Sequence, residues 1–438
     1  MALISWIACV VLGRFAGGPL TSDEAAYALI ARGMGQWEYR PVGLVTIARI
    51  GLMLGGSDLA LRLPCALASP LLLVVVAALG RRLGPWTGAG AAAILAGTHT
   101  IVLRAPELLN DLPSTTCLVA SLFVIVDELD RVYVPRYRLV TVAPLFAAAF
   151  YLRYGTAPVI AVIAIAAAAV WHRALWSRPG PAVVCALVFG ALLAPFLIYS
   201  QRTTGSIGGI LTMAGEVSGR RFIGHGLWIY LVSNPFRFYG IAITPVMLAG
   251  LAAVARPRLA RRRVAGFLGL VALGQVITVG MISHASTRYV FLAMVLLAIL
   301  GVDLLERCVR ALTLRRAGAI TAVLACATMV VTMVPLARKR DRGLALMLAA
   351  AHAIRDDSGG APCVVIARAT PQVMWYSRCE AIKIAGTSEP IALTAGWRWY
   401  AASTPRRPVD AEAIAASSGG VAIALPATGA WRIEPHGE

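Results

Sequence analysis

Residues 156–199 read TAPVIAVIAIAAAAVWHRALWSRPGPAVVCALVFGALLAPFLIY, two long apolar runs joined by a short break that carries Arg173 and Arg178. Each run is close to the roughly 20 residues that an α-helix needs to cross the hydrocarbon core of a bilayer. The same arrangement recurs along the 438 residues, of which 59% are hydrophobic and only 14% are charged. A soluble domain is about 45–50% apolar and about 25% charged, so the sequence predicts a polytopic membrane protein.

We expect about eleven membrane-spanning helices with the N-terminus in the cytoplasm. This orientation keeps the arginine-rich loops in the cytoplasm, as the positive-inside rule requires, whereas the opposite orientation would export them. The first span lacks a basic n-region and is interpreted as an uncleaved helix. The predicted spans are residues 2–18, 64–84, 86–103, 113–129, 139–153, 156–175, 181–199, 236–255, 264–282, 288–306 and 317–337.

The net charge of +19 is distributed over these separate loops. A nucleic-acid-binding protein normally presents its basic residues as one contiguous face. The spacing of the arginines therefore argues against nucleic-acid binding, and membrane lipids are the expected surroundings.

Two polar regions of the extracytoplasmic side have recognisable organisation. In the first loop, residues 22–34 and 42–54 are predicted to form two helices at the membrane surface. The sequence changes character after residue 337, which predicts a transmembrane domain over 1–337 and a small α/β extracytoplasmic domain over 338–438. That tail contains Cys363 and Cys379, which are either a bonded pair, if the tail is extracytoplasmic, or two unrelated thiols.

Ionisable side chains from separate extracytoplasmic loops are predicted to converge on one site. Charges near the ends of membrane helices are costly unless they find partners or a wet cavity. Arginine is suited to binding a phosphate, and a carboxylate can act as a general base. The candidates are Asp23, Glu24, Glu38, Arg40, Arg62, Arg104, Glu107, Asp111, Arg153, His284, Arg288 and Tyr289.

Several candidates also have a purely structural interpretation. Thr21-x-x-Glu24 is the pattern of a capping box, in which Glu24 only satisfies helix N–H groups. Arg104, Glu107 and Asp111 have the i+3 and i+4 spacing of a local salt-bridge ladder.

Candidates in loops and at the membrane interface have structural interpretations too. Glu38 and Arg40 are close enough in sequence to form a loop ion pair of little energetic weight. Arg62 is placed to anchor the second span at the interface. His284 and Arg288, one helical turn apart, are equally suited to contact lipid headgroups.

The candidates fall into motifs that occur in order and spacing over residues 1–310. These motifs resemble the extracytoplasmic motifs of GT-C glycosyltransferases, with the protein O-mannosyltransferases and the lipid A aminoarabinose transferases as the nearest branch. The matching segments are Asp23-Glu24-x-x-Tyr27-Ala28, Arg40-Pro41, Ala60-Leu61-Arg62, Asn110-Asp111-x-Pro113, Phe150–Gly155 and His284-x-x-x-Arg288-Tyr289.

The resemblance implies a GT-C fold and inverting transfer of a sugar from a polyprenyl-phosphate donor. It implies Asp23 as the catalytic base, with Glu24 beside it, and Arg40, Arg288 and also Arg153 as ligands of the donor phosphate. The remaining site residues implied as substrate contacts are Tyr27, Glu38, Arg62, Arg104, Asp111, His284 and Tyr289. The sequence identifies no cofactor with certainty; a divalent metal is compatible with the paired acids, because some relatives bind one, although no dedicated ligand set is present.

The sequence also departs from the family pattern. Arg40 stands where lysine is common in the aminoarabinose branch, and the neighbouring acid, Glu38, is displaced by one residue, which leaves the sugar open. The loop 200–235 is too small to be a large acceptor-binding domain, so a lipid, polysaccharide or other small acceptor is expected. We expect a bacterial inner or plasma membrane location with the active site on the extracytoplasmic side.

Two other functions are compatible with a membrane protein rich in arginine. A flippase or transporter of an anionic lipid would place charges near the bilayer midplane and show repeated halves; here the charges lie at one face and no repeat is visible. A non-catalytic assembly subunit of the same fold would tolerate loss of Asp23, which is present.

Overall fold

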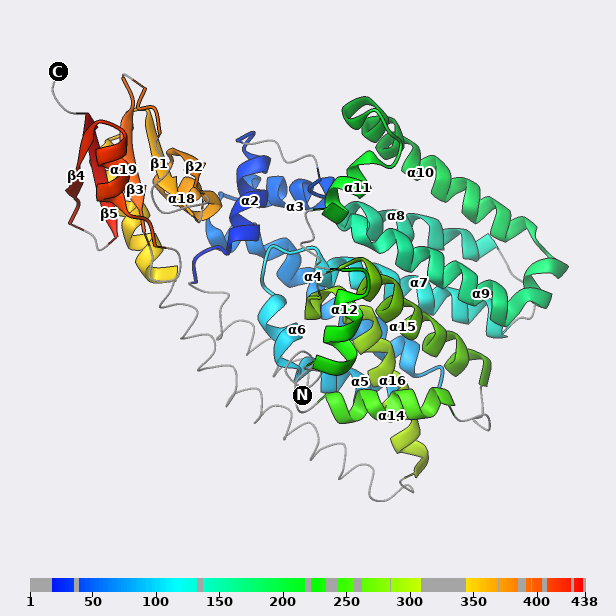
Figure 1. Cartoon of the computed structure of the whole chain (residues 1–438). Coiled ribbons are helices and arrows are strands. Elements are labelled where there is room, and N and C mark those ends of the chain that lie inside the picture. Colours follow the sequence, from blue (N-terminus) through cyan, green and yellow to red (C-terminus); the bar gives the residue numbers. More distant parts are fainter. Residues whose placement is uncertain are drawn as a thin grey trace. The chain divides into compact units, whose positions relative to one another are not determined.

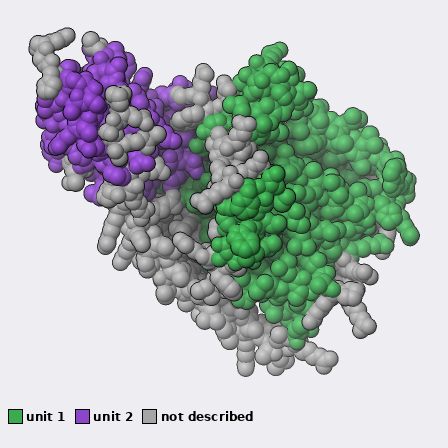
Figure 2. Space-filling view, viewed as in Figure 1, with its two compact units in different colours: residues 1–12, 37–47, 62–333 green, residues 13–36, 48–61, 334–438 purple. Residues whose placement is uncertain are grey.

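The computed structural model describes residues 18–34, 39–131, 137–216, 222–233, 243–255, 262–283, 285–308, 344–368, 370–384, 391–394, 396–403, 408–426 and 429–435. Two compact units make up the chain (Figure 2). Unit 1 comprises Met1–Leu12, Trp37–Ile47 and Arg62–Met333, and unit 2 comprises Gly13–Gln36, Ala48–Leu61 and Val334–Glu438. Unit 2 thus contains two segments of the first loop, Gly13–Gln36 and Ala48–Leu61, together with the C-terminal tail, and the sequence did not predict this grouping. The domain boundary predicted at residue 337 stays a prediction.

The described part of unit 1 is helical, as the apolar runs predict (Figure 1). Of the helices given below, the one that begins at Val42 ends in unit 2, and the one that begins at Asp58 has its first residues in unit 2. Among the described residues, six helices are long and apolar enough to cross a membrane: Asp58–Gly80, Asp111–Asp130, Tyr154–Ser177, Gly180–Thr204, Arg263–Ile282 and Thr287–Cys308. The helices are α3 (Val42–Met53), α4 (Asp58–Gly80), α5 (Thr87–Ala96), α6 (His99–Arg104), α7 (Asp111–Arg131), α8 (Val142–Leu152), α9 (Ala157–Ser177), α10 (Gly180–Thr204), α11 (Gly209–Glu216), α12 (His225–Trp228), α14 (Thr244–Ala255), α15 (Arg262–Ile282) and α16 (Phe291–Cys308), with short helices η2 (Tyr137–Thr141), η3 (Tyr154–Thr156), η4 (Ile229–Ser233) and η5 (Thr287–Val290).

One predicted span is interrupted. The run 86–103 was expected to be continuous, but α5 ends at Ala96 and α6 begins at His99. Thr98 between them has an extended backbone, with φ −82° and ψ 115°, and its hydroxyl donates a hydrogen bond to the carbonyl of Ile94 at 2.9 Å. The predicted spans 2–18 and 317–337 lie outside the described residues, apart from Gly18, and the span 236–255 is described from residue 243.

Helix α16 forms the centre of the unit 1 core. It packs against α14, α15, α5 and α7 and is buried along most of its length. Its contact with α14 is backbone to backbone: a Cβ added at Gly301 would lie 2.0 Å from the carbonyl oxygen of Val246. Small residues permit such close approach, which is how helices associate in a membrane, where burial of apolar surface gives little driving force.

Unit 2 contains the α/β domain that the tail predicts. Its sheet has the order β2-β1-β3-β5-β4, with β1 parallel to β2 and β3, and β5 antiparallel to β3 and β4. The helix over residues 344–358 and α18 pack on one face, and α19 packs on the other. The elements are β1 (Cys363–Ala367), α18 (Thr370–Ser377), β2 (Glu380–Lys383), β3 (Arg398–Ala402), α19 (Ala411–Ser417), β4 (Gly420–Ala424) and β5 (Ala430–Pro435).

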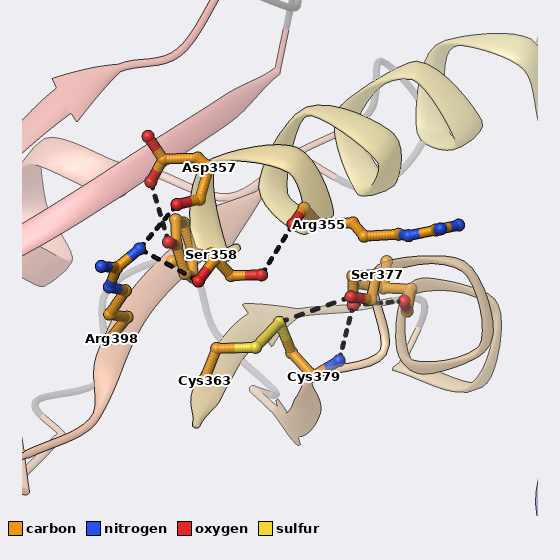
Figure 3. Close-up of a disulfide and its surroundings, with 9 residues drawn as sticks. Arg355, Asp357, Ser358, Cys363, Ser377, Cys379 and Arg398 are labelled. Atoms are coloured by element: carbon orange, nitrogen blue, oxygen red, sulfur yellow. Dashed lines mark hydrogen bonds between the residues drawn. A yellow bond between two sulfur atoms is a disulfide. The ribbon is translucent and has the colours of Figure 1, made fainter. Parts of the chain in front are cut away.

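A disulfide joins Cys363, the first residue of β1, to Cys379, two residues after α18 (Figure 3). The sequence allowed either a bonded pair or two unrelated thiols, and the structure contains the bonded pair. Disulfides persist in oxidising compartments, which agrees with the extracytoplasmic side expected for the tail.

Candidate active site

A buried carboxylate between two arginines is the centre of the ionisable cluster in unit 1. The side chain of Asp111 is 2% exposed, and its Oδ1 accepts a hydrogen bond from Nη1 of Arg153 at 2.5 Å. Its Oδ2 lies 3.9 Å from Nε of Arg288. The three side chains together carry a formal charge of +1, with two cations around one carboxylate.

Helix ends bring these three residues together. Asp111 begins α7, where the positive end of the helix dipole favours a carboxylate. Arg153 is the extended residue between α8 and η3, with φ −156° and ψ 106°. Arg288 lies in η5, directly before α16. Three loops far apart in sequence thus converge, as we expected from the cost of isolated charges in a membrane.

The aromatic ring of Tyr289 lies against both guanidinium groups. Its centroid is 4.5 Å from Cζ of Arg153 and 5.5 Å from Cζ of Arg288. Nη1 of Arg153 also donates a hydrogen bond to the carbonyl of Arg288 at 3.2 Å. The backbone here is held by Gln275, whose side chain donates to the carbonyl of Tyr289 and accepts from the amide of Ala293. The arginines are therefore held in place by contacts beyond the carboxylate.

The segment that carries Arg40 contacts the turn between α8 and η3, where Arg153 lies. The amide of Val42 donates to the hydroxyl of Tyr154 at 3.3 Å. A Cβ added at Gly43 would lie 2.7 Å from the carbonyl oxygen of Tyr151, so the start of α3 touches the end of α8. The Arg40-Pro41 step thus lies beside the turn that contains Arg153.

Three further candidates, Arg104, Glu107 and Arg62, have surroundings that fit a structural role. Arg104 and Glu107 form a local ion pair, with Nη1 and Oε2 2.6 Å apart, as the ladder interpretation predicts. Asp111 pairs with residues of other loops, Arg153 and Arg288. Arg62 is 2% exposed within α4, so it is buried and not an interface anchor at the surface.

The acidic pair of the first loop lies in unit 2. Helix α2 (Ser22–Ala31) starts with the predicted capping box: the amide of Thr21 donates to Oε2 of Glu24 at 2.8 Å, and the amide of Glu24 donates to the Thr21 hydroxyl at 3.4 Å. Glu24 is fully buried and Tyr27 is 4% exposed, whereas Asp23 is half-buried. The carboxylate of Glu24 is thus engaged in its own helix, and Asp23 is the acid of the pair with access to solvent.

Two other predicted site residues fall in segments that the structure does not describe, and the metal prediction can be compared with the described residues only. Glu38 and His284 lie outside the described residues. Within the part of the chain that the structure describes, no group of three His, Cys, Asp or Glu side chains could hold a metal ion.

Sequence reasoning missed the role of Asp58. This first residue of α4 accepts hydrogen bonds from Tyr376 and Trp375, more than 300 residues away. In the sequence, Asp58 is only an acidic residue at the start of a long apolar helix, and the helix dipole is enough to explain a carboxylate at that position.

Comparison with known proteins supports the resemblance. The model of the family described as dolichyl-phosphate-mannose-protein mannosyltransferase matches residues 40–199, which include Arg40, Arg62, Asp111 and Arg153. No curated protein sequence matches the chain.

Solved structures show the same fold. The crystal structure of ArnT from Cupriavidus metallidurans bound to undecaprenyl phosphate has a TM-score of 0.71 and 16% identity, and the match covers 99% of this chain and 96% of ArnT. ArnT in the apo state has a TM-score of 0.63, also with 16% identity, over 88% of this chain and 84% of ArnT. The oligosaccharyltransferase AglB from Archaeoglobus fulgidus, in complex with an inhibitory peptide and a dolichol phosphate, has a TM-score of 0.56 and 12% identity, over 89% of this chain and 64% of AglB. The predicted GT-C fold is confirmed.

Proposed function

We propose that the chain is an integral-membrane glycosyltransferase that moves one sugar from a polyprenyl-phosphate carrier to a lipid or glycan acceptor. The observation that carries this proposal is the cluster of Asp111, Arg153 and Arg288, whose net positive charge suits a phosphate. The chain that carries this cluster has the same fold as ArnT, which was crystallised with undecaprenyl phosphate. Two arginines at a phosphate give strong, directional, charge-assisted hydrogen bonds.

The reaction is a single displacement at the anomeric carbon. Asp23 takes the proton from the acceptor hydroxyl or amine, whose oxygen or nitrogen forms the new bond to the anomeric carbon. The bond from that carbon to the carrier phosphate breaks, and the lipid phosphate leaves with the electron pair. One displacement inverts the configuration of the sugar.

The arginines act where negative charge grows during this step. As the bond to the phosphate breaks, charge accumulates on an oxygen that Arg288, Arg153 and Arg40 are proposed to hold. Cations that are already held in place stabilise such charge without having to reorganise during the reaction. Asp111 holds two of these cations in place and prevents them from separating.

Glu24 positions the first turn of α2 in this mechanism. Its carboxylate accepts the Thr21 amide and fixes the first turn of α2, from which Asp23 projects. We therefore assign proton transfer to Asp23 and the geometry of the helix start to Glu24.

The experiment that tests the proposal is the formation of a new glycosidic bond in reconstituted liposomes. Purified protein is supplied with labelled polyprenyl-phosphate sugars and a lipid extract, and the product linkage is determined by NMR. A labelled product with inverted anomeric configuration is expected. Movement of the intact donor between leaflets without a new bond would favour the transporter, and neither bond nor movement would favour the non-catalytic subunit.

A further inference from the structure

We propose that Trp375 and Tyr376, on α18 of the C-terminal domain, are positioning residues for the reaction. They hold α2, and with it Asp23, against the first residue of α4. This inference rests on the proposed role of Asp23 as the base. It gives the C-terminal domain a task in catalysis that does not require it to touch a substrate.

One tyrosine hydroxyl connects two segments of the first loop. The hydroxyl of Tyr376 donates a hydrogen bond to Oδ2 of Asp58 at 2.5 Å and accepts one from the amide of Leu20 at 2.6 Å. A phenol can donate once and accept in addition, so both roles are used here. Leu20 directly precedes Thr21, the N-cap of α2, while Asp58 begins α4.

The neighbouring tryptophan holds the opposite end of α2. The guanidinium of Arg32, the C-cap residue of α2, lies 3.6 Å above the ring of Trp375, within the range of a cation–π interaction. The indole N–H of Trp375 donates to Oδ1 of Asp58 at 3.3 Å. Both oxygens of one carboxylate are therefore bound by adjacent residues of α18, and α2 is held just before its N-cap and at its C-cap.

Helix α18 is itself fixed to the sheet. Cys379, two residues after α18, is disulfide-bonded to Cys363 at the start of β1, and its amide donates to the hydroxyl of Ser377 at 3.2 Å (Figure 3). Arg378, between Ser377 and Cys379, has φ +67°, a left-handed conformation that is uncommon for a non-glycine residue. The two aromatic side chains thus extend from a covalently anchored helix, which makes them suitable as a rigid support.

Two ordinary explanations of the aromatic pair fit less well. Aromatic residues in a carbohydrate enzyme often stack on sugars, but Trp375 is only 4% exposed and Arg32 already covers its ring. Aromatic residues also fill hydrophobic cores, yet core packing does not require the polar atoms of two neighbours to bind the same carboxylate of Asp58. The directional contacts favour positioning.

The test compares two tyrosine hydroxyls of the same domain. Tyr376→Phe removes the hydroxyl that binds Asp58 and Leu20. Tyr400→Phe is the matched control, because it removes a buried hydroxyl that donates to Asp357 at 2.8 Å within the domain. Both variants are measured as full chains in lipid nanodiscs, with kcat and KM for a labelled polyprenyl-phosphate sugar and with hydrogen exchange of the amides of α2.

For Tyr376→Phe we expect kcat to fall about 10- to 100-fold, the cost of a misplacement of about 1 Å. The KM for the donor is expected to change less than about threefold, and exchange in residues 22–31 is expected to accelerate about tenfold, as loss of a hydrogen bond to a charged group implies. Tyr400→Phe is expected to leave kcat and the hydrogen exchange of α2 at the wild-type level. Asp58→Asn combined with Tyr376→Phe is expected to lose less than the two single variants added together, since both remove the contact between Tyr376 and Asp58.

Failure of this inference and failure of the proposed function give different results. Wild-type kcat and exchange in Tyr376→Phe, together with an inactive Asp23→Asn, would overturn the positioning role alone. Equal losses in Tyr376→Phe and Tyr400→Phe would also overturn it, because general destabilisation of the domain would then explain them. If Asp23→Asn is fully active, the proposed base is wrong, while faster exchange of α2 in Tyr376→Phe alone still establishes the mechanical contact.

Discussion

Replacement of Arg288 by glutamine should weaken the binding of polyprenyl phosphate without unfolding the protein. The Arg288 side chain is 24% exposed, and its Nε lies 3.9 Å from the buried carboxylate of Asp111. A hydrogen bond between a cation and a phosphate contributes about 1.5–3 kcal/mol net. Since about 1.4 kcal/mol corresponds to a factor of ten, the Kd should rise about 10- to 150-fold. The loss should be smaller at high salt, where exposed charges are screened.

The matched control lies at the other end of the same helical segment. Arg307 is bound by Asp303 through Nε and Nη2, both at 3.1 Å, and is 30% exposed. It is 19 residues from Arg288, roughly 28 Å along a helix. Binding of polyprenyl phosphate to Arg288→Gln, Arg307→Gln and wild type can be compared in nanodiscs by native mass spectrometry. Equal affinity of all three proteins would refute the assignment of the phosphate to this cluster.

Three further predictions concern stability. Asp111→Asn leaves two close cations without their buried carboxylate and should cost about 3–5 kcal/mol of stability; an unchanged thermal unfolding temperature would contradict this. Thr21→Ala removes the Thr21 hydroxyl from its capping box with Glu24 and should destabilise the first turn of α2 by about 1 kcal/mol. Hydrogen exchange of the α2 amides should become faster, and an unchanged exchange rate would contradict a role of the cap. Burial, aided by the hydrogen bond to Asp357, raises the pKa of Tyr400 to about 12. Because the folded state favours the neutral phenol, the contribution of Tyr400 to the free energy of unfolding is complete below about pH 10 and is lost as pH rises through about 12. Alkaline unfolding of Tyr400→Phe should therefore show a flatter decline of stability with pH than that of wild type.

Among the described residues, the apolar runs were sufficient to predict helices but not their breaks. Length and hydrophobicity locate a membrane helix well, because the bilayer leaves the backbone few other conformations. Gly97 and Thr98, where α5 and α6 separate, are also common within membrane helices, so nothing in that stretch distinguished a break from a continuous span.

Convergence of charge was predictable, but the partners were not. An isolated charge in a membrane must find a partner, which predicts that acids and arginines of different loops meet. The spacing of Arg104, Glu107 and Asp111 allowed a local ladder as readily as a remote pairing. The structure forms the first contact locally and pairs Asp111 with Arg153, 42 residues away.

The support of α2 by the C-terminal domain could not have been predicted. Tyr376 and Asp58 are 318 residues apart, and neither lies in a pattern that identifies its partner. The aromatic side chains of the tail are compatible, by sequence alone, with sugar stacking, a core or a membrane interface. Their contacts depend on tertiary packing, which local sequence patterns do not encode.

The central claim is that Asp23 is the base in a sugar transfer, and one comparison tests it most directly. Sugar transfer from labelled polyprenyl phosphates is measured for wild type, Asp23→Asn and Asp356→Asn, the last being the same chemical change at an exposed aspartate of unit 2. We predict that Asp23→Asn binds the donor normally but loses transfer by at least about 100-fold, as removal of a general base implies, while Asp356→Asn stays active. Full activity of Asp23→Asn would contradict the account.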